Sequence, residues 1–331
     1  YNIPASVRLH GPLNKPALRW AVGELVRRHE ALRTTFAQVD AQPHQLIHEV
    51  LDPTWVEEDL RGVPAELREP RALELATSEA RRPFDLERGP LLRICLIQLG
   101  DEDQVVILNT HHIISDQWSY GIIARELVAS YNAFCAGRPF AVQPDLAIQY
   151  ADFAQWQRGW LTGAVLEQQL AHWKSQLADV PVVALPTDRP RLPVHSFKGD
   201  HVSLDLSWSL VNRLKQLSVR EGVTLYMVFL AGFFGLLHRL TQQKDLVIGT
   251  PIANRHRLEI EELIGTFVNT LVLRTEVTGE LTFRELLRKV RDLSLDAYAH
   301  QDIPFEKLVE ELRPDRSQGG LPLVPASILC R

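Results

Sequence analysis

The sequence of 331 residues predicts an α/β protein with a sheet in each half. Apolar residues recur every three to four positions in several segments, as between Ala17 and Val26, which is typical of helices packed on a core. Short apolar runs such as residues 105–108 lie between them and are typical of buried strands. The length allows two lobes, each with its own core.

Composition narrows the class of protein. The 45% hydrophobic and 23% charged content is that of a globular protein, and the net charge of -5 argues against a nucleic-acid partner. The most apolar segment, residues 225–237, is too short to span a bilayer, so we expect a core helix and no membrane partner. Cys95, Cys135 and Cys330 are too widely spaced for a disulfide framework or a zinc site, which favours a reducing, cytoplasmic setting.

The first half is expected to form a sheet with helices around it. In order, the expected elements are a strand at 7–10, a helix between Asn14 and Glu30, strands at 32–36 and 45–50, a helix at 72–80, and a hairpin of strands 91–99 and 104–109. Asn14 is a suitable helix cap because Pro16 follows in the first turn. A Gly100-Asp101 turn joins the hairpin, and we expect Ser119 to cap the helix after it.

The second half follows a proline-rich stretch between about residues 136 and 200. The expected elements are a polar helix at 165–177, a strand at 201–206, helices at 210–221 and 224–239, strands at 246–249 and 267–274, a helix ending near Ala299, and a helix at 305–312. Thr282 and Glu285 have the spacing of a capping box. We therefore expect an N-terminal lobe at 1–150, a connecting segment at 151–195 and a C-terminal lobe at 196–331.

The stretch that could carry chemistry is residues 109–119, N-T-H-H-I-I-S-D-Q-W-S. It places His111 and His112 at the mouth of a buried strand, where a general base or a positioning group would sit. Because neighbouring strand residues point to opposite faces, the two histidines are not expected to share a site, and no metal is expected there. Taken by itself, the pair is better explained as structural than as catalytic.

Asp116 could orient His112 or hold the loop through an ion pair. A carboxylate beside a buried strand end needs a cation or several donors. Arg239, Arg255 and Arg274 are candidates from the second half, with a slight preference for Arg255 because it follows a turn-like Pro-Ile-Ala-Asn segment. We expect Asp116 to be structural.

The sequence contains no G-x-S-x-G elbow, no phosphate-binding loop of the G-x-x-x-x-G-K type, and no cysteine in a nucleophile motif. A covalent intermediate on the protein therefore has no support. A base that activates a nucleophile supplied by a substrate fits better.

Five motifs follow one another along the chain: R-H-E-A-L-R-T-T-F at 28–36, H-H-I-I-S-D at 111–116, Y-A-D-F-A-Q-W at 150–156, I-G-T-F-V-N-T at 264–270, and H-Q-D-I-P-F-E at 300–306. In their order and their residues they resemble the motifs of the condensation domains of nonribosomal peptide synthetases. These domains belong to the chloramphenicol-acetyltransferase-like acyltransferases. The resemblance covers nearly the whole chain.

The resemblance implies two acetyltransferase-like lobes in a V-shaped pseudo-dimer with an interlobe tunnel. Upstream and downstream peptidyl carrier proteins would dock at its ends, beside an adenylation domain of the same synthetase. No cofactor would be bound directly, because the substrates arrive as thioesters on the 4'-phosphopantetheine of the carriers. The amine of the downstream aminoacyl group would attack the upstream acyl or peptidyl thioester.

The same resemblance assigns the catalytic role to His112, as a base or as a group that positions the amine. The residues expected to support the site are His111, Asp116, Gln117, Ser119, Arg28, Arg33, Asn269 and Arg255. Arg28 and Arg33 match the arginines of the family's R-H-E motif, and a helix-end charge and an ion pair that stabilises the lobe would also explain them. Asn269 either lies near the tunnel or caps a strand end.

The chain departs from the family pattern in three places. Gln117 replaces the usual glycine after the aspartate, which could narrow the path to the site or change the choice of donor. The family's first motif is absent before Tyr1. At the other end, residues 318–331 are unlike the family's continuation, which suggests a truncated frame and an apolar surface left uncovered in the second lobe.

Other functions remain open at this point. The segment 251–274 and Trp118 resemble the subtype that joins an L-donor to an L-acceptor. His111 argues against the cyclising subtype, in which an aspartate replaces it. An ester-forming acyltransferase, an impaired fragment and a carrier-docking module remain alternatives.

Overall fold

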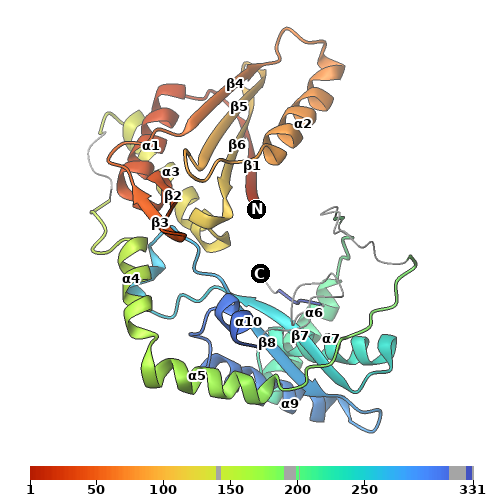
Figure 1. Cartoon of the computed structure of the whole chain (residues 1–331). Helices are drawn as coiled ribbons and strands as arrows, with labels where there is room; N and C mark the ends of the chain where they lie inside the picture. The colour runs from red at the N-terminus through yellow and green to blue at the C-terminus, as the bar shows by residue number, and fades with distance from the viewer. Residues whose placement is uncertain (139–142, 190–198, 201, 313–325, 330–331) are drawn as a thin grey trace. The chain divides into compact units, whose positions relative to one another are not determined.

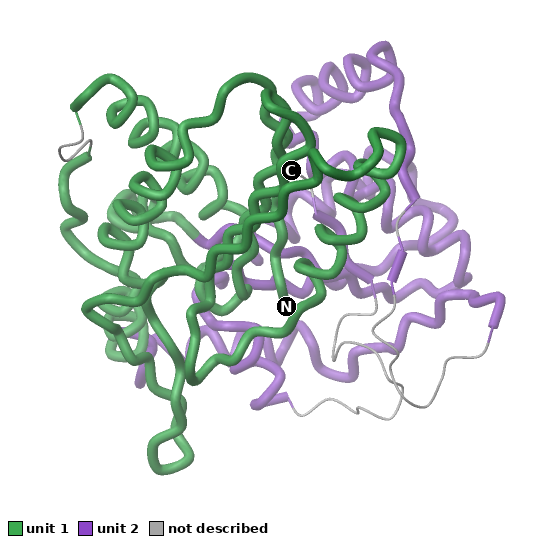
Figure 2. Tube along the Cα trace, turned by 90° about the horizontal axis from the view of Figure 1, so that it is seen from above, with its two compact units in different colours: residues 1–159, 255–267 green, residues 160–254, 268–331 purple. Residues whose placement is uncertain are grey.

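The computed structural model describes the chain except residues 139–142, 190–198, 201, 313–325 and 330–331. The described residues form two compact units, shown in different colours in Figure 2. Unit 1 comprises Tyr1–Gly159 and Arg255–Phe267, and unit 2 comprises Trp160–Asn254 and Val268–Arg331. Each unit is described by itself.

Unit 1 is built on a four-stranded sheet in the order β1-β6-β5-β4 (Figure 1). The strands are β1 (Asn2–His10), β4 (Thr54–Asp59), β5 (Leu92–Gly100) and β6 (Asp103–His111). β5 and β6 form the predicted antiparallel hairpin, and β1 adds to β6 so that Asn2 lies opposite His111. β4, which the sequence did not predict, pairs parallel to β5.

Helices cover both faces of this sheet, which explains why β5 is buried along most of its length. On one face, Ile94 packs with Leu25 of α1 (Lys15–Arg28) and Ile122 of α3 (Gln117–Cys135). On the other face, Ile97 packs with Ala72 of α2 (Ala65–Arg81). The remaining elements of this unit are η1 (Glu30–Arg33), β2 (Thr34–Val39), β3 (Gln42–Ile47), η2 (His112–Ile114), α4 (Tyr150–Trp160) and α8 (Leu258–Glu261).

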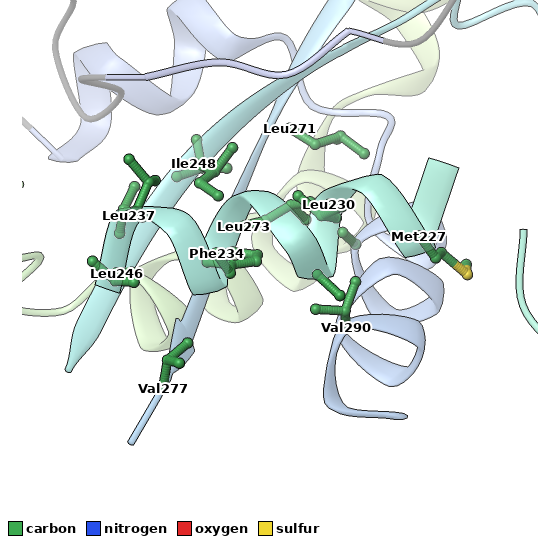
Figure 3. Packing of buried hydrophobic residues seen from close by; sticks show 14 of the residues in the cluster. Met227, Leu230, Phe234, Leu237, Leu246, Ile248, Leu271, Leu273, Val277 and Val290 are labelled. Atoms are coloured by element: carbon green, nitrogen blue, oxygen red, sulfur yellow. The ribbon is translucent and has the colours of Figure 1, made fainter. Parts of the chain in front are cut away.

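Unit 2 contains a two-stranded antiparallel sheet of β7 (Asp245–Ile252) and β8 (Asn269–Glu276). Its helices are α5 (Gly163–Gln176), α6 (Trp208–Glu221), α7 (Leu225–Thr241), α9 (Phe283–Ala299) and α10 (Phe305–Leu312). The core forms where α7 lies across the sheet: Phe234 packs with Leu246, Leu273 and Val290 (Figure 3). The predicted capping box of Thr282 and Glu285 begins α9.

Two local predictions were wrong. The cap of α3 is Asp116, whose Oδ1 accepts a hydrogen bond from the Ser119 backbone N–H at 2.9 Å, so the helix begins two residues before Ser119. Aspartate and serine are both good caps, and the ion pair described below holds Asp116 in place. Residues 202–206 form no strand, although position 201 of the predicted strand lies outside the described residues.

The two units differ from the division expected from the sequence. The expected connecting segment, 151–195, is shared, because α4 belongs to unit 1 and α5 to unit 2. Inside the expected C-terminal lobe, Arg255–Phe267 belongs to unit 1. The reason is packing: Ile260 and Phe267 form a buried cluster with Phe153 of α4.

In unit 2, apolar residues are exposed on α6 and α7. Trp208 and Val219 of α6 are 74% and 82% exposed, and Leu240 of α7 is 52% exposed. An apolar pocket of about 620 Å³ lies between Phe233 of α7, Phe283 and Leu329. Near the C-terminus, the described residue Ile328 donates a backbone hydrogen bond to Gly249 of β7 at 2.9 Å.

Of the helices that the structure describes, none by itself is long and apolar enough to cross a membrane. α6 and α7 meet that criterion only when taken together, and they are bent by 102° at the break between them.

Candidate active site

His112 is the first residue of η2, where the chain leaves β6. Its backbone N–H donates to the Tyr1 carbonyl at 2.8 Å, and its carbonyl accepts the Thr266 hydroxyl. The imidazole is half-buried, and in the described part of the chain no hydrogen bond engages it. The backbone of His112 is thus fixed on both sides, while its ring nitrogens stay available.

His111 is placed differently. Its Nδ1 accepts a hydrogen bond from the Ile113 backbone N–H at 3.1 Å, which caps η2. The ring lies between Tyr1 and Phe84, with centroids 6.2 and 6.1 Å away. Burial lowers the pKa of this imidazole, and the neighbouring His112 adds to the shift. The contacts of His111 therefore stabilise the loop.

Asp116 is buried at the start of α3 and forms an ion pair with Arg255 at 3.2 Å. Its Oδ1 also accepts from the hydroxyl of Ser119 at 2.8 Å, and its Oδ2 accepts from the backbone N–H of Phe267 at 3.0 Å. Arg255, the slightly preferred one of the three candidate arginines, therefore makes the contact with Asp116. Arg274 instead pairs with Asp245, at 2.7 Å.

Arg255 also contacts the segment that it begins. Its Nη1 donates to the carbonyls of Ile260 and Leu263, both at 2.7 Å. Its guanidinium carbon lies 4.0 Å from the centre of the Phe267 ring. Burial lowers the pKa of this guanidinium, and the charge of Asp116 opposes that shift.

Ser119 and Thr266 join the same segment to the histidine loop. The Ser119 hydroxyl accepts from the Gly265 backbone N–H at 3.1 Å and from Arg255 at 3.2 Å. The Thr266 hydroxyl reaches the carbonyls of His112 and, at 3.3 Å, Ser115. A segment far away in the sequence therefore fixes both ends of the loop that carries His112.

Gly265 allows Tyr150 to pack against this segment. A Cβ atom on Gly265 would lie 2.1 Å from Cδ2 of Tyr150. The Tyr150 hydroxyl donates to the Thr266 carbonyl at 2.9 Å, and burial raises its pKa to about 12, so it remains a donor. Its ring contacts Phe267 edge-on at 5.1 Å.

Gln117 is the first residue of α3 and is exposed. Its backbone is helical and has no positive φ. Glycine is therefore not required here for its conformational freedom. What distinguishes this chain at position 117 is the added side chain.

Arg28 and Arg33 make protein contacts in unit 1. Arg28 forms an ion pair with Glu126 of α3 at 2.5 Å, and the same carboxylate accepts from His29 Nε2 at 2.9 Å. Arg33 donates to the His48 carbonyl at 2.5 Å. The His29–Glu126 contact was not predicted, because nothing in the sequence marks Glu126 among the polar residues of its helix.

Asn269 lies in unit 2, at the start of β8. Its Nδ2 donates to the carbonyls of Gln301 and Ile303 at 2.9 and 2.8 Å, and its Oδ1 accepts from the backbone of Thr270 and Phe305. Both donors and both acceptor positions are occupied. This matches the strand-end role more closely than contact with a substrate.

The structure thus brings His112, Asp116, Ser119 and Arg255 together in unit 1, and Asn269 belongs to the other unit. The arrangement offers a half-buried imidazole on a loop whose backbone is hydrogen-bonded to Tyr1 and Thr266. It does not offer a metal site: among the described residues, the group with suitable spacing lies in unit 2.

Comparison with known proteins decides the family. The family model described as "Condensation domain" matches residues 1–330. The chain belongs to the condensation domain family. The resemblance seen in the five motifs is thereby confirmed.

Relatives of this condensation domain occur in large synthetases. The linear gramicidin synthase of Brevibacillus parabrevis includes a polypeptide that is 49% identical over 98% of this chain, which spans 4% of that polypeptide. The X-domain from teicoplanin biosynthesis has a TM-score of 0.85 at 30% identity, over 98% of this chain and 72% of that one. A four-domain nonribosomal peptide synthetase bound to AMP and glycine has a TM-score of 0.86 at 26% identity, over the whole of this chain and 25% of that one.

The close approach at Gly265 gives a first prediction. Gly265→Ala is expected to lower the free energy of unfolding by roughly 1–3 kcal/mol, because the new methyl group displaces Tyr150. Denaturant unfolding measures this. The matched control is Gly121→Ala in α3, where an added Cβ meets nothing within 4 Å. Equal stabilities of the two variants would contradict the steric argument.

The buried His29 gives a second prediction. Burial lowers its pKa from the ordinary 6.5, and Glu126 opposes only part of the shift. As the pH falls, His29 is therefore protonated in the unfolded chain before it is protonated in the folded chain. The contribution of the neutral, buried His29 to the free energy of unfolding is complete above pH 6.5 and is lost as the pH falls through the folded-state pKa. In denaturant unfolding between about pH 8 and about pH 5, wild type should lose stability more steeply than His29→Gln. Parallel curves would exclude His29 as the cause.

Proposed function

We propose that this condensation domain forms amide bonds between two carrier-bound substrates. The donor is an acyl or peptidyl thioester on an upstream carrier. The acceptor is the amine of an aminoacyl thioester on a downstream carrier. The family and the large synthetases among its relatives support this reaction class.

The observation that carries the proposal is the state of His112. Its backbone is fixed by Tyr1 and Thr266, and its imidazole has no hydrogen bond in the described residues. A structural histidine would be expected to use its ring nitrogens, as His111 does with Ile113. A ring held in place without a partner is suited to receive a group from outside the protein.

The reaction that fits needs little from the protein besides placement and proton transfer. The acceptor amine attacks the donor thioester carbon, a C–N bond forms, and the C–S bond breaks to release the upstream pantetheine thiol. The nitrogen loses a proton in the process. The imidazole of His112 accepts that proton or holds the amine in line, and the proton balances the leaving thiolate.

The partners follow from the same reaction. The substrates arrive on the 4'-phosphopantetheine of upstream and downstream peptidyl carrier proteins, and no cofactor is bound directly. A neighbouring adenylation domain would load the downstream carrier, in keeping with the multidomain relatives. The V-shaped arrangement, the tunnel and the cytoplasmic setting stay predictions.

Removing the imidazole tests this function. His112→Ala is expected to slow condensation by about 10²–10⁴-fold, the range for a lost general base. The measurement is mass spectrometry of the condensed product after the chain is mixed with two loaded carrier proteins. His44→Ala, an exposed histidine on β3, is the control and should keep the wild-type rate.

Each outcome has a clear meaning. Product formation at the wild-type rate in His112→Ala would remove this residue from the mechanism. Binding of both carriers without product, even by the wild-type chain, would support a docking module instead. An ester product with a hydroxyl-bearing acceptor would indicate the ester-forming alternative.

Position 117 gives a separate prediction. Gln117→Gly is expected to raise the rate or widen the range of donors, because the exposed glutamine side chain follows directly on the histidine loop. Gln117→Ala removes the side chain without adding backbone freedom and should behave in the same way. A panel of donor thioesters with one acceptor measures both effects. An unchanged rate and donor range in both variants would exclude Gln117 from donor choice.

A further inference from the structure

Unit 2 contains a second set of histidines, where α5 meets the C-terminal end of α9. The two helices are fixed there by Trp173, which is 2% exposed and donates from its indole N–H to the His300 carbonyl at 2.9 Å. His172, the residue before it, is thereby directed to the last turn of α9. The junction is part of the unit's hydrophobic core, which contains Trp173 and Ala297.

Three potential ligands meet at this junction. Asp296 and His300 are four residues apart at the end of α9, so both lie on one face of the helix. His172 comes from α5. One donor atom from each side chain lies within 4.8 Å of the others, with His172 Nε2 at 3.8 Å from a carboxylate oxygen of Asp296.

The backbone contact of His300 selects the tautomer of its neutral ring. Its Nδ1 lies 2.9 Å from the Asp296 carbonyl, which can only accept, so the proton sits on Nδ1 and the neutral ring keeps a lone pair on Nε2. Histidines that bind metals are commonly oriented in this way, by an N–H to a backbone carbonyl.

The surroundings favour a cation. The C-terminal end of a helix carries partial negative charge, and Asp296 adds a carboxylate. The side chains of His172 and His300 are 14% and 20% exposed, whereas that of Asp296 is 46% exposed, so the group is sheltered and still open to solvent.

We propose that His172, Asp296 and His300 bind one divalent transition-metal ion of the Zn²⁺ class. Two imidazole nitrogens and one carboxylate oxygen form a ligand set that binds such ions more tightly than it binds Mg²⁺ or Ca²⁺. Water completes the coordination. The bound ion links α5 to α9. This site belongs to unit 2, whereas His112 belongs to unit 1, and it is independent of the proposed condensation reaction.

Binding requires one movement. The two imidazole rings are stacked, with centroids 3.6 Å apart and planes 2° from parallel. An ion lies in the plane of each imidazole that binds it, and two parallel stacked planes share no such point. One ring therefore turns about its Cβ–Cγ bond as the ion enters.

Titration with Co²⁺ tests the proposal, because its visible absorption reports the number and type of ligands. The chain is prepared without a polyhistidine tag and freed of metal with a chelator. We expect one equivalent to bind. His172→Gln and Asp296→Asn should each weaken binding by at least about tenfold. The control, His44→Gln, removes an exposed histidine of unit 1 and should bind as wild type does.

The half-exposed Asp296 makes Asp296→Asn the decisive variant, since it is not expected to disturb packing. Its thermal unfolding without metal should match that of wild type, whereas added Zn²⁺ should raise the Tm of wild type more than that of Asp296→Asn. No saturable uptake by wild type would overturn the proposal. Binding by Asp296→Asn and His172→Gln with wild-type affinity would also overturn it.

Discussion

The ion pair of Asp116 and Arg255 is the interaction on which the histidine loop depends. Both side chains are almost completely buried, at 4% and 1% exposure. Taking two charges out of water is costly, and the cost is offset only because further donors and acceptors surround them, among them the Ile260 carbonyl and the Phe267 N–H. Loss of either partner would leave an uncompensated buried charge and lower the free energy of unfolding by about 3–5 kcal/mol.

The pair matters for chemistry because it joins segments that are far apart in sequence. Through Arg255, the segment that ends at Phe267 is held against α3, and Thr266 then reaches the carbonyl of His112. The loop is thus positioned through its backbone, through the side chains of His111 and Asp116, and through the neighbouring segment. The ring of His112 needs no contact of its own to stay in place, which leaves it free for a substrate.

The sequence predicted the parts that depend on local chemistry. The Asn14 cap, the hairpin before His111 and the box of Thr282 with Glu285 follow from spacing of a few residues, and all three are present. Contacts between distant segments leave no such pattern. The membership of Arg255–Phe267 in unit 1 was missed for this reason. Ser119 was wrongly predicted as the cap of α3. Asp116 can cap the same helix, and it is also held in place by its ion pair with Arg255.

Position 117 shows how the structure changes a question that the sequence raised. A glycine can be needed for its backbone conformation or for the space that it leaves. The backbone of Gln117 is helical, as the first residue of α3, and residues with a side chain adopt that conformation without strain beyond their helix propensity. A glycine is therefore not needed at position 117 for its backbone conformation. Any effect of Gln117 has to come from the volume and polarity of a side chain that follows the loop carrying His112, and this effect acts on the substrate and not on the fold.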